Sequence, residues 1–352
     1  MSRNLIPTSL TVLLMGSVAY AEVPNVAVDI APVHSLVARV MDGVGTPALI
    51  VQSGASPHEY SLRPSEASAL QEADLVFWMG EDLTPWMEDA VATLATKAAV
   101  TTLLEAEGTT LLDFREGALF EAHDHEDHDT HDEEKHADGE EHGHDDHDHA
   151  EDKEHGHDEH AKDHGHDDHG DEDHADHEDH AHGAHDPHAW LSPQNANTWL
   201  NVIAAQLSSA DPDNAGAYFA NAAAARAEME ALSAQVTTTL EPVRGRSFIV
   251  FHDAYQYFEN AFDFPASGAI SIGDASDPSP ARIAEIQGRI RAEGIDCVLA
   301  EPQFNAALIA TVLDGTDANT GIIDPLGAAL EPGAALYPQL IRNMADTLAE
   351  CL

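Results

Sequence analysis

Residues 213–240 read DNAGAYFANAAAARAEMEALSAQVTTTL, and they set the organisation of the chain on both sides. The run is rich in alanine, the residue with the highest helix propensity, and it is broken only afterwards, by Pro242 and Gly245. A helix of this length extends about 40 Å, enough to run the height of a molecule. We therefore predict a rigid helix that joins two halves of the chain.

Short apolar runs alternate with amphipathic stretches in both halves. The runs that predict strands lie at 25–30, 48–52, 75–79, 247–251, 295–300 and 321–323. The stretches that predict helices begin at Pro64 and lie at 33–42, 194–207, 280–292 and 338–350. Alternation at this spacing indicates βαβ units. The predicted fold class is α/β, with two lobes of parallel sheet joined by the long backbone helix.

The first 21 residues have the pattern of an export signal. Arg3 precedes a short apolar run, and Ala19-Tyr20-Ala21 matches a small-x-small cleavage site. The alternative is a buried N-terminal helix. No later segment has the roughly 18 apolar residues of a membrane span, so we expect an exported, soluble protein without membrane insertion. Its predicted parts are a signal peptide at 1–21, an N-terminal lobe at 22–208, a linker at 209–244 and a C-terminal lobe at 245–352.

The chain has only two cysteines, Cys297 and Cys351, and export would determine their oxidation state. An oxidising compartment would let them pair and tie the C-terminal tail to the strand that holds Cys297. Such a bridge closes a loop of about 55 residues and adds roughly 4 kcal/mol of stability. The alternative is two separately buried thiols.

Charge excludes one class of partner. The chain has 64 acidic and 15 basic residues, a formal net charge of −49. Such a surface repels nucleic acids and anionic lipids, and it concentrates cations. We expect no nucleic-acid partner.

Residues 121–185 hold 28 of the acidic residues and 20 of the 24 histidines. The stretch has almost no apolar side chains to bury, so we interpret it as a long mobile insertion in the N-terminal lobe. Histidines and carboxylates in a flexible chain can chelate zinc at several weak sites. The alternative is a solubilising spacer with no role in metal binding.

Three of the four histidines outside this insertion occupy informative places. His58 lies just past a predicted strand, His252 directly follows another, and His188 opens the segment after the insertion. Asp324 also follows a strand. Ligands of open parallel sheets bind beyond the carboxyl ends of the strands. Three imidazoles with a carboxylate or a water form a tetrahedral site suited to one tightly bound Zn²⁺, which we place in the interlobe cleft.

Each of these residues also has a structural interpretation. A lone histidine at a strand end is usually a hydrogen-bonded structural residue, and we keep that interpretation for His34. Asp324 precedes a proline, where aspartate commonly caps a turn or a helix. The joint occurrence of His58, His188 and His252 beside a metal-attracting insertion favours the metal site.

The order of the motifs resembles a known family. The motifs are GASPHEYSLRPS (54–65), DPHAWLSP (186–193), FHDAY (251–255), EPQF (301–304) and DPLG (324–327). They resemble the periplasmic zinc-binding proteins of bacterial zinc ABC transporters, the ZnuA type. The resemblance spans essentially the whole mature chain and implies two α/β lobes, a backbone helix and a metal between the lobes.

The resemblance also implies roles for single residues. His58, His188 and His252 correspond to the three metal-binding histidines, and Asp324 to an acidic position that some members use as a fourth ligand. Manganese-binding relatives typically carry Glu where this chain has His252, which favours zinc. Certain zinc members have Glu where this chain has Pro57, so the fourth position is either Asp324 or water. The two cysteines match a bridge found in part of the family.

We therefore predict a monomeric periplasmic protein that captures Zn²⁺ and hands it to the membrane permease of a zinc ABC transporter. It is predicted not to be an enzyme. The first alternative is a metal-dependent adhesin on the same scaffold. The second is an exported zinc hydrolase with Glu301 as its base, but the chain contains no His-Glu-x-x-His motif.

Overall fold

The computed structural model describes residues 23–115, 185–271, 278–303 and 306–352. All of these residues fall within one compact unit. The predicted signal peptide at 1–21 lies outside the described residues. So does the predicted insertion at 121–185, apart from His185.

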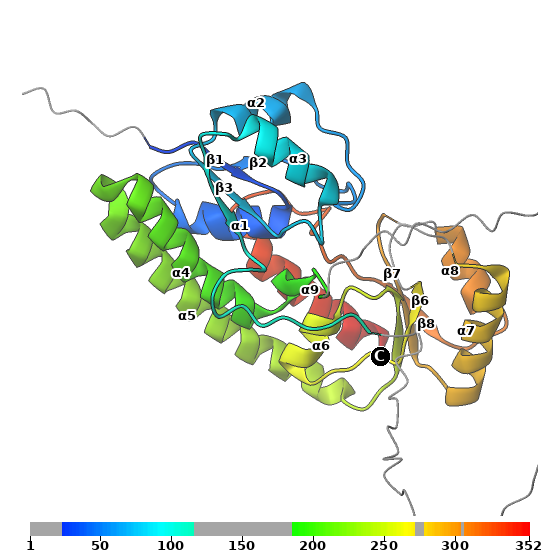
Figure 1. Ribbon diagram of the computed structural model, residues 1–352. Coiled ribbons are helices and arrows are strands. Elements are labelled where there is room, and N and C mark those ends of the chain that lie inside the picture. The colour runs from blue at the N-terminus through cyan, green and yellow to red at the C-terminus, as the bar shows by residue number, and fades with distance from the viewer. Residues whose placement is uncertain (1–22, 116–184, 272–277, 304–305) are drawn as a thin grey trace, which may run out of the picture. The chain divides into compact units, whose positions relative to one another are not determined.

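A four-stranded parallel sheet forms from the first part of the chain (Figure 1). Its strands run in the order β2-β1-β3-β4. Their bounds are β1 (Val26–Val28), β2 (Ala48–Leu49), β3 (Leu75–Trp78) and β4 (Ala99–Thr102). The helices between them are α1 (Ala31–Val40), α2 (Pro64–Glu72) and α3 (Pro85–Leu94). Strands β1 and β3 are buried along their whole length, which explains why they are continuous apolar runs.

A second four-stranded parallel sheet forms from the last part, in the order β6-β5-β7-β8. Its strands are β5 (Phe248–His252), β6 (Ala269–Ser271), β7 (Cys297–Ala300) and β8 (Asn319–Ile322). Its helices are α6 (Gln256–Phe262), α7 (Pro280–Glu293), α8 (Ala306–Leu313) and α9 (Leu336–Cys351). Two parallel sheets with helices between their strands confirm the predicted α/β fold class.

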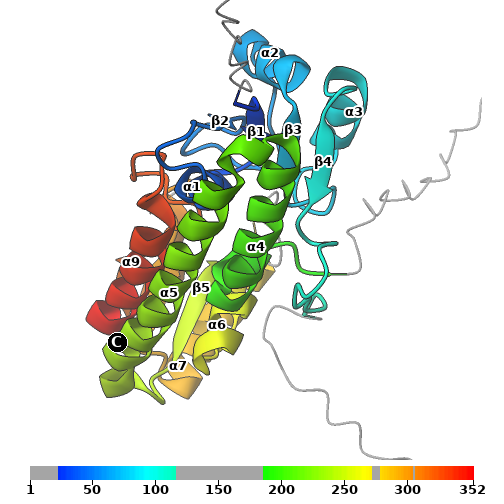
Figure 2. The same ribbon diagram turned by 90° about the vertical axis from the view of Figure 1, so that its left-hand side faces the viewer.

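Two long helices lie side by side and link the sheets, α4 (Pro193–Ala210) and α5 (Ala215–Leu240), with α9 along the other flank of α5 (Figure 2). Helix α5 is the predicted backbone helix and has 26 residues. It begins two residues later than predicted, because Pro212–Asn214 form a separate 3₁₀ turn capped by Asp211. Its buried side chains recur every three or four positions: Tyr218, Ala222, Ala225, Met229, Leu232, Val236 and Leu240.

One buried cluster of apolar side chains runs through both halves. It contains Val28 and Phe77 of the first sheet, Val250 and Leu299 of the second, and Met229 of α5 between them. Helices α1, α4 and α9 contribute to the same cluster. The two sheets therefore share a core across α5, and the domain boundaries at 208–209 and 244–245 stay a prediction.

The sequence analysis did not predict five of the elements, namely α3, β4, α6, β6 and α8. Strand β4 is an edge strand whose residues Ala99–Thr102 are exposed or half-buried, so it lacks the apolar run of a central strand. Strand β6 has only three residues. Helix α6 has seven residues, too few for a helical period to stand out.

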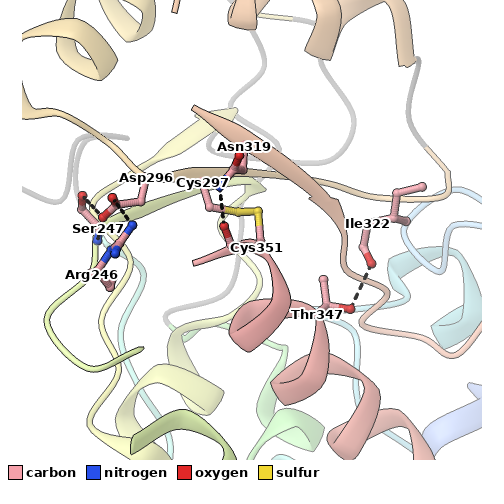
Figure 3. Close-up of a disulfide and its surroundings, with 8 residues drawn as sticks. All are labelled: Arg246, Ser247, Asp296, Cys297, Asn319, Ile322, Thr347 and Cys351. Atoms are coloured by element: carbon pink, nitrogen blue, oxygen red, sulfur yellow. Dashed lines mark hydrogen bonds and ion pairs between the residues drawn. A yellow bond between two sulfur atoms is a disulfide. The ribbon is translucent and has the colours of Figure 1, made fainter. Parts of the chain in front are cut away.

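The predicted disulfide between Cys297 and Cys351 is present (Figure 3). It joins the first residue of β7 to the last residue of α9, with the Cα atoms 5.8 Å apart. Asn319 of β8 donates a hydrogen bond to the carbonyl of Cys351 beside it. The C-terminal helix is thus bound to the second sheet at its end.

Asp29, directly after β1, joins the carboxyl ends of two neighbouring strands. Its carboxylate oxygens accept hydrogen bonds from the backbone N–H groups of Ile30 at 2.7 Å and Met79 at 2.6 Å. The side chain is fully buried, and this burial raises the pKa of Asp29 from 3.8 to about 7 against the lowering effect of those hydrogen bonds.

Asp29 gives stability a defined pH dependence. Between about pH 4 and pH 7 the folded protein keeps a proton that the unfolded chain has released, so the free energy of unfolding falls as pH rises through this window. Asp29→Asn cannot titrate. We expect the wild type to lose at most roughly 4 kcal/mol relative to this variant across the window, and little above it. Urea unfolding of both proteins at a series of pH values measures the difference, and parallel curves would contradict it.

Candidate metal centre

Three histidines from distant parts of the chain meet in one small pocket. His58 lies in the loop after β2, His188 just before the 3₁₀ turn Ala189–Leu191, and His252 at the end of β5. The ring centroids of His58 and His188 are 5.6 Å apart, and those of His188 and His252 are 5.4 Å apart. The other residues that line the pocket are Ser56, Pro57, Trp190, Gln303, Pro325 and Leu326.

These separations match a zinc site. With Zn–N bonds of about 2.0–2.1 Å and tetrahedral angles, two imidazole centroids around one zinc ion lie about 5 Å apart. Within the described ranges, however, no three His, Cys, Asp or Glu side chains already form a set that could hold a metal ion. The ring spacings are those expected around one zinc ion, although the described side chains as placed do not yet form a complete set of ligands.

Two of the imidazoles are oriented by buried carboxylates. Nδ1 of His188 lies 2.7 Å from Oδ1 of Asp186, and Nδ1 of His252 lies 2.6 Å from Oε1 of Glu301. A carboxylate only accepts hydrogen bonds, so each Nδ1 carries the hydrogen and Nε2 becomes the nitrogen suited to a metal. This carboxylate–imidazole arrangement is typical of histidines that bind zinc. The donor set fits the ion.

The loop of His58 has a different support. Nε1 of Trp86 donates a hydrogen bond of 2.7 Å to the carbonyl of Pro57, directly before His58. The hydroxyl of Tyr60 donates one of 2.8 Å to Glu66. His58 is half-buried, whereas His188 and His252 are buried. The first sheet therefore presents its histidine from the more exposed side of the pocket.

The segment of His188 is bound to the second half of the chain. Nε1 of Trp190 donates to the carbonyl of Pro325 at 2.8 Å, and the hydroxyl of Tyr337 donates to the carbonyl of Trp190 at 2.8 Å. Tyr257 donates to the carbonyl of Asp186 at the same distance. These bonds join the segment of His188 to three positions in the part of the chain that follows β5.

Asp324 caps a turn, the structural role that the sequence analysis gave as one of its two interpretations, and its role as a zinc ligand stays a prediction. Its oxygens accept hydrogen bonds from the backbone N–H groups of Leu326, Gly327 and Ala328 at 3.0, 2.9 and 2.6 Å. Asp324 lines a separate hollow and is not among the residues that line the pocket of the histidines.

His34 has the structural place that the sequence analysis kept for it. It is buried in α1, and its Nε2 lies 3.1 Å from the carbonyl of Pro47. Burial lowers the pKa of His34, which favours the neutral ring.

Sequence reasoning did not identify the orienting role of Asp186 and Glu301. Glu301 was considered as a hydrolase base and as part of a motif, and Asp186 only as part of a motif. Histidines that bind zinc commonly hydrogen-bond a carboxylate through their second ring nitrogen. This rule could have identified Asp186 and Glu301 as candidate partners. Gln303 was likewise considered only as part of a motif. It lines the pocket two residues after Glu301, and its buried amide oxygen has no hydrogen-bond partner among the residues that the structure describes.

The family model described as zinc-uptake complex component A, periplasmic (ZnuA), matches residues 26–351. The chain belongs to this family. A high-affinity zinc uptake system protein ZnuA from Brucella abortus is 45% identical over 96% of this chain and 94% of its own length. The protein of that name from Paracoccus denitrificans is 41% identical over 95% and 93%.

Solved structures agree with the ZnuA-type fold. A crystal structure of ZnuA superposes with a TM-score of 0.67 at 20% identity, over 94% of this chain and 99% of that one. A mutant of a laminin-binding adhesin from Streptococcus agalactiae reaches 0.66 at 21% identity, over 94% and 99%. Likeness at such identity shows the fold alone. Within the described part of the chain, no helix has the length and apolar character needed to cross a membrane.

The carboxylate partners give a prediction for zinc affinity. Glu301→Gln and Asp186→Asn keep the size of each side chain but remove the charge that orients the imidazole and raises its basicity. We expect zinc affinity to fall about 10- to 100-fold in each variant. Competition with a chromophoric chelator measures this loss.

A matched control is Asp211→Asn, which alters a buried carboxylate at the turn between α4 and α5. Its zinc affinity should equal that of the wild type. Equal affinity in the Glu301 and Asp186 variants would show that these carboxylates do not support the site.

Proposed function

We propose that the protein captures Zn²⁺ in the periplasm and delivers it to the membrane permease of an ABC-type zinc transporter. Membership of the ZnuA family and the names of its relatives support this role. The observation that carries the proposal is the convergence of His58, His188 and His252 in one pocket, two of them backed by buried carboxylates. Zinc is the cargo of such a protein.

In this proposal the imidazoles of His58, His188 and His252 are three ligands of a single tight site. Water takes the fourth position, because Asp324 already accepts three backbone hydrogen bonds and lines another hollow. Imidazole is a borderline donor, so three of them favour zinc over manganese, which prefers oxygen ligands.

The proposed role is binding and release, without catalysis. A hydrolase would need a general base beside a zinc-bound water. Glu301, the candidate base, instead holds Nδ1 of His252 at 2.6 Å and is 3% exposed. A carboxylate engaged in this way supports a ligand and does not activate water. We propose a monomer that meets the permease with zinc bound.

We further propose that residues 121–185 bind additional zinc weakly and raise its concentration near the tight site. Their 20 histidines and 28 acidic residues support this proposal. Deprotonated imidazoles and carboxylates bind divalent ions even in an unfolded chain, although each such site is weak.

The ligand assignment is tested by single substitutions. His58→Ala, His188→Ala and His252→Ala each remove one of three bonds to the ion, and we expect zinc affinity to fall by orders of magnitude in each. Competition titration of the purified mature protein gives the affinity. His34→Gln is the matched control, because this described histidine lies in α1, outside the pocket. Wild-type affinity in any of the three variants would remove that residue from the ligand set.

The insertion is tested by deletion of residues 121–184, which keeps His185. We expect the tight site to retain its affinity, while the number of zinc ions bound per protein falls. Isothermal titration calorimetry separates the two classes of site. Loss of the tight site on deletion would contradict our assignment of the insertion.

A further inference from the structure

Arg115 is the last described residue before position 116, and its guanidinium lies between two carboxylates of the second half of the chain. Nε donates to Oδ2 of Asp253 at 3.0 Å, and Nη2 donates to the other oxygen of the same carboxylate. Nη1 and Nη2 donate to Oε2 and Oε1 of Glu259 at 2.8 and 3.0 Å. One cation thus binds two carboxylates, each through two hydrogen bonds.

All three side chains are largely withdrawn from water. The exposed fractions are 18% for Arg115, 8% for Asp253 and 6% for Glu259. Burying a charge is costly unless it is paired and hydrogen-bonded, and removing one partner leaves the others uncompensated. Without Arg115, two buried carboxylates would face each other across the space that it fills, and they would have to take up a proton or move apart.

That chain includes a proposed zinc ligand. Asp253 directly follows His252, and the backbone N–H of Ala254 donates to the carbonyl of His252 at 2.9 Å in the turn that ends β5. Glu259 lies in α6, the next helix, and also accepts a hydrogen bond from the backbone of Ala266 at 3.0 Å. Arg115 therefore joins the turn after His252 to the helix that follows it.

The segment before Arg115 also contacts the element that carries His188. The backbone N–H of Leu112 donates to the hydroxyl of Tyr257 at 2.9 Å, and the N–H of Asp186 donates to the carbonyl of Leu112 at 2.8 Å. Asp113 and His185 pair through their side chains at 2.9 Å. Residues 112–115 therefore contact both segments from which His188 and His252 project.

We propose that Arg115 is a positioning residue for the zinc site: its guanidinium holds Asp253, and so fixes the turn after β5 with the imidazole of His252 facing that of His188. The inference rests on the proposed function. In this proposal the N-terminal half of the chain supplies the ligand His58 and also Arg115, which positions the ligand His252 of the C-terminal half. Arg115 itself does not line the pocket.

The test compares Arg115→Met, Arg115→Lys and the wild type in the mature protein. Methionine removes the charge, and lysine keeps a charge but cannot bind two carboxylates through a planar fork. We expect zinc affinity to fall at least about tenfold for Arg115→Met and by less for Arg115→Lys. The visible absorption spectrum of bound Co²⁺, used as a probe of ligand geometry, should change in Arg115→Met.

The matched control is Arg246→Met, which breaks an arginine–aspartate pair with Asp296 next to the opposite end of β5. It should leave zinc affinity and the Co²⁺ spectrum unchanged, even if the melting temperature falls. A purely structural Arg115 would behave as this control does. Wild-type affinity and spectrum in Arg115→Met would therefore overturn the proposal, whatever the melting temperature.

Two further measurements complete the test. If Arg115→Met does not fold, Arg115→Lys decides, since unchanged zinc affinity in that variant would also overturn the proposal. His252→Ala is measured alongside. If it binds zinc as the wild type does, the site itself is refuted and the role of Arg115 with it. If only His252→Ala loses affinity, the zinc site stands and the positioning role fails.

Discussion

Two buried hydrogen bonds, from His188 to Asp186 and from His252 to Glu301, are the interactions on which the proposed function depends. Each holds Nδ1 of an imidazole and so presents Nε2 to the pocket, and each places a negative charge behind a ring that would donate to a cation. Burial makes these bonds strong, because little water competes for the carboxylates. His58 lacks the same degree of burial and enters from the first sheet.

The fold brings these groups together by a simple arrangement. Both sheets are parallel and direct the carboxyl ends of β2 and β5 toward the same pocket, where parallel sheets commonly bind ligands. A shared core around α5 keeps the sheets in place, and the segment of His188 is hydrogen-bonded to Pro325, Tyr337 and Tyr257. Such support limits the freedom that would be lost when an ion binds, which favours affinity.

Charge acts at two ranges in this protein. The net charge of −49 attracts cations to the chain, and in the proposed function the pocket selects among them by the chemistry of imidazole. In so acidic a chain, a buried arginine between two carboxylates has a clear role. Arg115 offsets the negative charge of Asp253 and Glu259 and hydrogen-bonds both carboxylates, which stabilises the turn after His252 in its buried position.

Residue order alone was enough for the α/β class, the long helix and the central strands, because each depends on local periodicity. The cysteine pair followed from the presence of only two cysteines in a chain expected to be exported. The choice of the three histidines rested on short motifs, and their role as ligands stays a prediction. The edge strand β4 and the short α6 and β6 depend on neighbours distant in the chain. The turn role of Asp324 is local, because its hydrogen bonds reach only to Ala328. The pairing of His252 with Glu301, 49 residues away, and that of Arg115 with Asp253, 138 residues away, also depend on the fold. Asp186 lies only two residues before His188. Hydrogen bonds and ion pairs act through space, and only the folded chain shows which distant groups lie within reach of one another.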